Sequence, residues 1–210
     1  MGLAVCATIA CTSAVAGTWT EMGSAGRLPS TAQLITGSGP LTEIFGDLTE
    51  LTEVDMYLIR ISDPLGFSTY TLDSIFSVPD PQLFLFNYAG YGVYMNDDGG
   101  TSQSVLPAGH PNGPMIAGLY YLAISRFNND PYSIAGSIFP LDAVETTGPA
   151  SPGGTSPVTY WNDDVLPVID FETSYGIALT GAQFIPEPGT MLLSGFGLLA
   201  ALARLQRRRK

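Results

Sequence analysis

The sequence predicts an all-β protein, an antiparallel β-sandwich, with one apolar helix at its C-terminal end. Short runs rich in Ile, Leu, Phe and Tyr are separated by turn residues, among them 24 glycines and 16 prolines in 210 residues. This spacing is typical of all-β domains. No segment before residue 186 sustains a 3.6-residue apolar period, so helix should be minor there. With both ends set aside, about 170 residues remain, which suits one domain.

The strands can be placed in order along the chain. Residues 24–33 are polar and loop-like. Tyr57, Ile59 and Ile61 give one strand a wholly apolar face, whereas 82–88 and 118–127 are apolar on both faces and should be central. Strands are expected at 42–47, 55–61, 66–72, 82–88, 90–95, 118–127, 132–139 and 175–180.

A Gly-, Pro-, Ser- and Thr-rich stretch at 141–164 is expected to form a flexible loop with little core, although Trp161 interrupts it. The region 165–185 contains the last strand. Ile177 and Leu179 alternate with small or polar residues there, which favours return to the sandwich over a free stalk.

The C-terminal end has three parts in a fixed order: Pro186-Glu187-Pro188, an uncharged stretch at 189–203, and a basic end. As a helix the uncharged stretch spans about 22 Å, short of a hydrocarbon core roughly 30 Å thick. It can insert if the basic side chains snorkel. A basic cluster stays cytoplasmic, which places the body of the protein outside. The basic residues are Arg204, Arg207, Arg208, Arg209 and Lys210.

This order resembles the PEP-CTERM sorting signal of Gram-negative bacteria. The resemblance implies recognition by an exosortase, a membrane transpeptidase, with cleavage near Pro186, Glu187 and Pro188 and loss of the helix. It also implies a host that makes extracellular polysaccharide, which would then be a partner of the protein. We therefore expect transient insertion into the inner membrane through 190–203, with the C-terminus cytoplasmic. The protein would then move to the cell surface or extracellular matrix.

The other end, residues 1–16, resembles a signal peptide without its basic n-region. An apolar run precedes Ala14-Val15-Ala16, which suggests cleavage after Ala16. A lipoprotein modified at Cys11 is the alternative. Because Cys6 and Cys11 both lie in this segment, the mature chain should hold no cysteine, and therefore no disulfide or thiolate metal site.

Between residues 17 and 185 there are eighteen acidic side chains and only Arg27, Arg60 and Arg126 as basic ones, a formal net charge of −15. Such a surface repels phosphate backbones, so nucleic acid is not expected as a partner. Acidic oxygens do suit calcium, although acidity can also serve solubility alone.

The stretch from about residue 25 to 140 resembles the bacterial pre-peptidase C-terminal (PPC-like) domain. The matching pieces include Ile44-Phe45-Gly46-Asp47, 82–86, Asn96-Asp97-Asp98 and 118–124. The resemblance implies a jelly-roll-like sandwich at 17–140. Some members of that family bind calcium and some bind matrix polymers.

Calcium is the expected site chemistry, with Asn96, Asp97 and Asp98 as ligands at a Gly-Gly turn and Asp55 contributing if its strand end lies nearby. Asx-type turns are the alternative explanation of these residues. The carboxylate pairs Asp97-Asp98 and Asp163-Asp164 are adjacent in sequence, which seldom suits glycosidase chemistry. With a single histidine, His110, in a turn, we expect no enzyme and no cofactor other than possible calcium.

Together these features predict an exported, exosortase-sorted, non-enzymatic surface or matrix protein with a structural or adhesive role. Two alternatives stay open. One is a calcium- or carbohydrate-binding module, since the many tyrosines could stack on sugar rings. The other is a secreted hydrolase.

Overall fold

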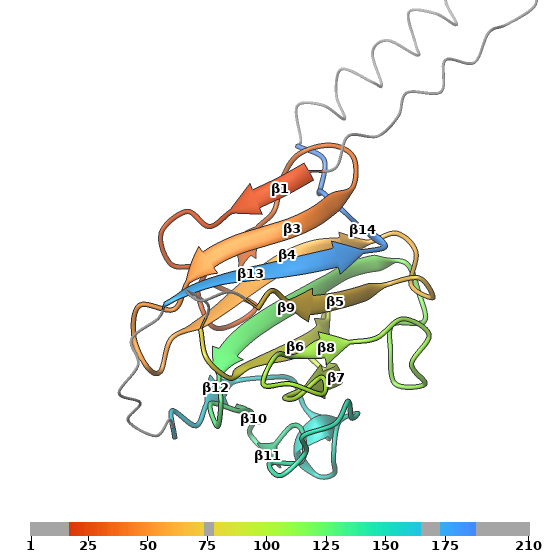
Figure 1. Cartoon of the computed structure of the whole chain (residues 1–210). Coiled ribbons are helices and arrows are strands. Elements are labelled where there is room, and N and C mark those ends of the chain that lie inside the picture. Colours follow the sequence, from red (N-terminus) through yellow and green to blue (C-terminus); the bar gives the residue numbers. More distant parts are fainter. Residues whose placement is uncertain (1–16, 74–77, 165–172, 188–210) are drawn as a thin grey trace, which may run out of the picture.

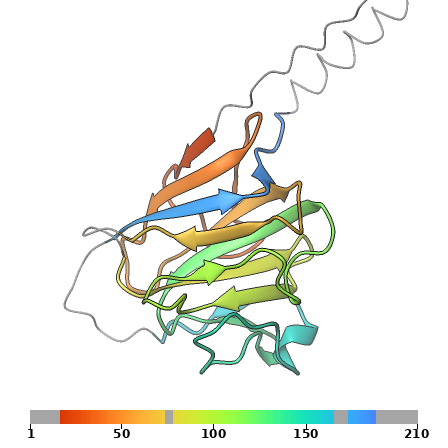
Figure 2. The same cartoon turned by 45° about the vertical axis from the view of Figure 1, so that its right-hand side comes forward.

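Two β-sheets pack face to face in the computed structural model, which describes residues 17–73, 78–164 and 173–187 (Figures 1 and 2). The all-β prediction is confirmed for these residues. The first sheet has the strand order β1 (Gly17–Thr20), β3 (Leu41–Asp47), β13 (Ser174–Thr180), β5 (Ser68–Thr71) and β8 (Val105–Leu106). The second has the order β14 (Ala182–Gln183), β4 (Val54–Ile61), β9 (Gly118–Arg126), β6 (Pro81–Asn87) and β7 (Gly92–Asn96), with β2 (Gln33–Leu34) beside β4.

The inner core lies between these sheets and follows the predicted alternation. Tyr57, Ile59 and Ile61 of β4 face Ile177 and Leu179 of β13 across it. Because side chains alternate along a strand, the other faces of β4, β6 and β9 must meet something else.

Most predicted strands coincide with observed ones, but residues 132–139 do not form a single strand. They divide into β10 (Pro131–Ser133) and β11 (Gly136–Ser137), which pair with each other as a hairpin. Gly136 reverses the chain with a φ of 125°, a conformation that glycine tolerates.

The expectation of purely antiparallel sheets is wrong at two pairings. β1 runs parallel to β3, and β2 runs parallel to β4. After β1 the chain crosses to the second sheet, where β2 pairs, and returns to the first as β3. A crossover of this kind is what parallel neighbours require.

A third layer covers the outer face of the second sheet, and it corrects the expectation that 141–164 holds little core. β10, β11 and β12 (Tyr160–Trp161) form a small sheet, joined by the 3₁₀ turn η1 (Gly153–Thr155). Val158 and Trp161 are buried with Phe84 and Phe86 in a second core. The rings of Trp161 and Phe84 meet edge-on, 5.2 Å apart.

The sandwich also does not end at residue 140. β13 lies between β3 and β5 in the middle of the first sheet. The predicted return of this strand is therefore confirmed, and the region that contains it belongs to the same body as 17–140.

One buried acid, Asp55 of β4, links the two sheets. Its Oδ2 accepts a hydrogen bond from the hydroxyl of Tyr175 at 2.7 Å, and its Oδ1 accepts one from the backbone N–H of Ala25 at 3.2 Å. The Tyr175 hydroxyl also lies 2.5 Å from that of Tyr57. Burial raises the pKa of Asp55 to about 8, and the nearby carboxylates of Glu21 and Glu53 add to the rise.

Removing Trp161 should separate the third layer from the sheet. We expect Trp161→Ala to lower the free energy of unfolding by about 3–5 kcal/mol, because a buried indole leaves a cavity beside Phe84. Tyr160→Ala, a change at the exposed neighbour, should cost only about 1 kcal/mol. Urea denaturation of both variants measures the difference, and equal losses would show that the layer does not depend on Trp161.

The second prediction concerns pH. Asp55 has a folded pKa of about 8 against an ordinary value of 3.8. Its contribution to stability is therefore full below about pH 4 and is lost as the pH rises toward 8. Relative to the natural protein, Asp55→Asn should gain up to about 1.4 kcal/mol of unfolding free energy per pH unit across this window. Thermal unfolding from pH 5 to 9 tests this, and parallel profiles for the two proteins would contradict it.

Candidate metal centre and sorting motif

Three strands of the second sheet place acidic residues at one edge. β6 begins where β7 and β9 end, since Leu83 pairs with Asn96 and Pro81 pairs with Arg126. Asp80 immediately precedes β6, and Asp97 and Asp98 immediately follow β7. Antiparallel pairing therefore gathers these carboxylates from segments that lie apart in the sequence.

The carboxylates of Asp80, Asp97 and Asp98 form a compact cluster, the acidic cluster below. One ligand oxygen from each lies within 4.8 Å of the others. Asp97 is only 4% exposed, and its Oδ1 is buried without a hydrogen-bond partner. Burial and the charges of Asp80, Asp98 and Asp130 raise the pKa of Asp97 to about 7.

Asp130, which follows β9, brings a fourth carboxylate to the same edge, and like Asp97 it is buried. It is 3% exposed, and its Oδ2 has no hydrogen-bond partner. Burial raises the pKa of Asp130 to about 6, whereas hydrogen bonds from the side chains of Gln82 and Asn162 oppose the rise. The edge thus concentrates negative charge in a poorly hydrated place.

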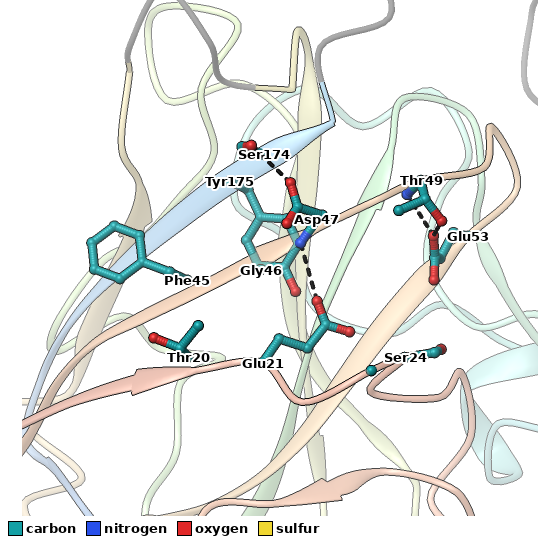
Figure 3. A pocket seen from close by; sticks show the side chains of 11 residues that line it. Thr20, Glu21, Ser24, Phe45, Gly46, Asp47, Thr49, Glu53, Ser174 and Tyr175 are labelled. Atoms are coloured by element: carbon teal, nitrogen blue, oxygen red, sulfur yellow. Dashed lines mark hydrogen bonds between the residues drawn. The ribbon is translucent and has the colours of Figure 1, made fainter.

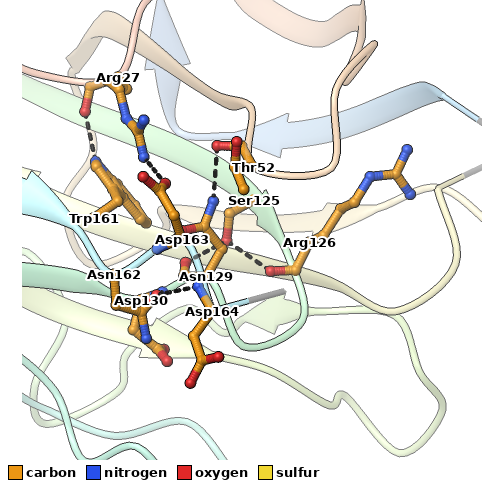
Figure 4. Close-up of polar contacts among 10 residues, drawn as sticks. All are labelled: Arg27, Thr52, Ser125, Arg126, Asn129, Asp130, Trp161, Asn162, Asp163 and Asp164. Atoms are coloured by element: carbon orange, nitrogen blue, oxygen red, sulfur yellow. Dashed lines mark hydrogen bonds and ion pairs between the residues drawn. The ribbon is translucent and has the colours of Figure 1, made fainter. Parts of the chain in front are cut away.

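The turn that carries Asp130 is held by a polar network between β9 and β12 (Figure 4). The backbone N–H of Asp130 donates to Asn162 Oδ1 at 2.9 Å, and Asn129 Nδ2 donates to the carbonyl of Thr52 at 3.1 Å. Arg27 forms an ion pair with Asp163 close by. These contacts position the backbone around Asp130, and none of them involves its Oδ2.

Asn96, a predicted calcium ligand, has its side chain engaged in shaping the loop. Its Nδ2 donates to the carbonyls of Asp98 at 3.0 Å and Val144 at 3.1 Å, and its Oδ1 accepts the backbone N–H of Val105 at 2.6 Å. The turn explanation therefore fits Asn96, whereas Asp97 and Asp98 point into the acidic cluster.

Asp55, the other predicted ligand, does not join the acidic cluster. The pairings Asp55–Ile124, Ile124–Leu83 and Leu83–Asn96 place it three strands from Asn96, roughly 14 Å across the sheet. Its side chain faces the inner core and Tyr175. Asp97 instead lies beside Asp130, whose segment covers the outer face.

Asp80 was missed by the sequence reasoning, because Pro79-Asp80-Pro81 reads as a simple turn. The available signal was its position: an acid just before one buried strand and a pair of acids just after the next. Antiparallel neighbours with that pattern bring the acids together.

A second acidic feature is a groove of about 610 Å³ where β3 ends and β13 begins (Figure 3). Here the carboxylates bond to the protein itself. Glu21 accepts the backbone N–H of Asp47 at 3.0 Å, Asp47 accepts the hydroxyl of Ser174 at 2.7 Å, and Glu53 accepts the hydroxyl of Thr49 at 2.8 Å. They cap backbone and hydroxyl groups, which is a structural role.

The last described residues, before Pro188, run along the opposite end of the molecule. Phe184 and Ile185 donate backbone hydrogen bonds to the carbonyls of Gly39 at 3.1 Å and Ile35 at 2.9 Å. The N–H of Gly37 donates back to Ile185 at 2.9 Å. Pro186 is half-buried and Glu187 is exposed, so the chain leaves the domain at Pro186-Glu187.

A family model for the PEP-CTERM protein-sorting motif matches residues 184–209. The chain carries a PEP-CTERM sorting motif. This finding confirms that part of the sequence prediction, and it marks the protein as exported, processed by exosortase and sorted to the cell surface. A search of curated proteins found no match. The resemblance to a PPC-like domain stays a prediction, which the β-rich fold accommodates.

Several predictions fall outside the described residues. They are the signal peptide at 1–16 with Cys6 and Cys11, Pro188 of the sorting motif, and the apolar stretch at 190–203. Among residues 17–73, 78–164 and 173–187, no helix has the length and apolar character needed to cross a membrane.

Ser104 supports the loop that carries the acidic cluster, and its loss should be costly. Its buried hydroxyl lies 2.6 Å from the carbonyl of Pro81, 2.9 Å from that of Asn96 and 2.7 Å from that of Asp97. We expect Ser104→Ala to lower the free energy of unfolding by about 1–3 kcal/mol, because buried acceptors lose their donor. The exposed Ser102→Ala is the matched control, and identical urea midpoints for the two variants would contradict this role.

Proposed function

We propose that this protein is a non-enzymatic structural or adhesive component of the cell surface or extracellular matrix. In this proposal the C-terminal stretch holds the chain in the inner membrane until exosortase cleaves near Pro186–Pro188. The folded domain is then transferred to the surface or matrix, where extracellular polysaccharide is its surrounding material.

The observation that carries the proposal is the direct junction between domain and sorting motif. Hydrogen bonds to the Ile35–Gly39 segment hold Phe184 and Ile185, and the motif begins at Phe184. Cleavage at 186–188 would therefore release a body with almost no tail. Such an arrangement suits a compact module that is displayed whole.

Strand pairing also fixes the position of the acidic cluster relative to this junction. Ala182 of β14 pairs with Ile61 at the far end of β4, whereas Val54 at its beginning pairs with Ser125 near the acidic edge. The described start of the sorting motif, which follows β14 (Figure 1), and the acidic cluster therefore lie at opposite ends of the strands of the second sheet. The acidic end is therefore the end remote from the point where the chain leaves the domain.

The environment of His110 supports a non-catalytic role. Its Nδ1 accepts the backbone N–H of Asn112 at 3.2 Å, and its ring stacks on that of Tyr94 with centroids 6.0 Å apart. Both contacts are those of a turn residue that packs against the domain.

Carbohydrate binding is a second candidate, favoured by one aromatic pair. The rings of Tyr88 and Tyr121 stack with planes 5° apart and centroids 6.0 Å apart, and Tyr88 is 60% exposed. A flat exposed ring next to a sheet can stack on a sugar. A glycan array with the natural protein and Tyr88→Ala would detect this, since only the former should bind.

The sorting step can be tested by disrupting the motif. Expressed in a bacterium with an exosortase, a chain carrying Glu187→Gln and Pro188→Ala should stay at full length in the membrane fraction. The natural chain should be shortened and move to the surface or matrix fraction. Asp142→Asn, a change at an exposed acid, is the control, and its processing should be normal. Equal release of all three proteins, or release in a strain without exosortase, would refute the proposed route.

A further inference from the structure

We propose that Asp80, Asp97 and Asp98 bind a calcium ion at the end of the sandwich that faces away from the sorting motif. This inference goes beyond the proposed function, which does not depend on a ligand. It also changes the ligand set expected from the sequence, because Asp80 replaces Asp55 and Asn96.

The first support is the geometry of the acidic cluster. Three carboxylates offer oxygens within 4.8 Å of one another, a separation that a single ion can bridge. Calcium oxygen distances are about 2.3–2.6 Å, so two ligands on opposite sides of the ion lie up to about 5 Å apart. The three oxygens therefore fit one coordination sphere with little movement.

The second support is independent of clustering. Asp97 is 4% exposed, and its Oδ1 is buried and accepts no hydrogen bond from the protein. A buried carboxylate oxygen without a partner is costly, and natural proteins rarely leave one. A bound cation satisfies it directly. The acids of the groove in Figure 3 contrast with it, since each of them already accepts a hydrogen bond.

Charge balance leads to the same conclusion. The negative charges of Asp80, Asp98 and Asp130 lie close enough to repel that of Asp97. In the described part of the chain no arginine forms an ion pair with any of the three cluster residues. A divalent cation would offset this repulsion and would tie the segment before β6 to the loop after β7.

The donor atoms favour calcium over other metals. All three donors are carboxylate oxygens, which suit calcium or magnesium, whereas zinc and copper sites favour imidazole or thiolate. The nearby His110 has its Nδ1 occupied by Asn112. Calcium accepts six to eight ligands in irregular geometry, with carbonyls and water completing the set, whereas magnesium demands a near-ideal octahedron. Carboxylates from two separate segments match the calcium preference.

Calcium titration of the purified full-length chain, kept in mild detergent, tests the proposal. Calorimetry should show one ion per chain. Calcium at one hundred times its dissociation constant should raise the Tm by about 5 °C or more over the value in EDTA. Magnesium at the same concentration should give a smaller shift.

Two variants make the assignment specific. Asp97→Asn keeps the side-chain shape, so it should fold, show an unchanged or higher Tm in EDTA, and lose the calcium-induced shift. Asp142→Asn removes one exposed acid elsewhere and should keep the full shift. The proposal is overturned if 10 mM calcium, on the order of the weakest extracellular sites, gives neither heat nor a Tm shift. It is equally overturned if Asp97→Asn responds to calcium as the natural protein does.

Discussion

Burial of the second sheet on both faces is the constraint on which the rest of the structure depends. Phe84 and Phe86 of β6 point away from the inner core, while Leu83 and Leu85 point into it. A strand that is apolar on both sides needs a covering layer on each. The first sheet supplies one layer, and the segment with Val158 and Trp161 supplies the other.

The composition of that segment suggested a flexible loop, but burial of two large apolar side chains outweighs the effect of the surrounding glycines and prolines. Burial of an aromatic side chain stabilises the folded state by kilocalories per mole. The preference of the neighbouring residues for irregular structure is weak, so the segment can still be ordered.

A sheet that is buried on both faces can accommodate few polar side chains within its strands. The polar side chains therefore lie at the ends of the strands. At one end the acids before β6 and after β7 and β9 gather, partly shielded from water by the layers on either side. This shielding leaves an oxygen of Asp97 without a hydrogen-bond partner and raises the pKa of its carboxyl group. At the other end β14 pairs with β4 and leads directly into the sorting motif. The long strands that form the core therefore also separate the acidic cluster from the sorting motif, where processing takes place.

The sequence alone predicted the long strands and two of the three residues of the acidic cluster. A run that alternates, as in β4 and β13, or that is apolar on both faces, as in β6 and β9, is a strong signal, so these strands and β3 were found. Strands of two residues, such as β2, β8 and β12, carry no period and exist only because a neighbour pairs with them. Asp97 and Asp98 were identified by their adjacent positions in one loop, but Asp80 required knowledge of which strands are neighbours. Asp55 was grouped with them as the first residue of an expected strand whose end could lie near that loop. Its position three strands away, facing Tyr175, follows from sheet order, which local sequence does not encode.

The charge distribution gives the two ends different chemistry. Most of the basic residues of the chain lie beyond residue 203, so removal of the sorting motif leaves a domain with a formal charge of −15 between residues 17 and 185. Many of its acids, including Glu50, Glu53, Asp80 and Asp97, lie at the end of the sandwich remote from that motif. Exposed charges interact over about 8 Å at physiological salt, so neighbouring copies in a crowded matrix would repel at these ends unless cations intervene. Calcium held by the acidic cluster would lower this repulsion where it is strongest. Processing and ion binding would then act in sequence on one molecule, since cleavage removes the positive tail and the remaining acidic end meets the calcium of the extracellular medium.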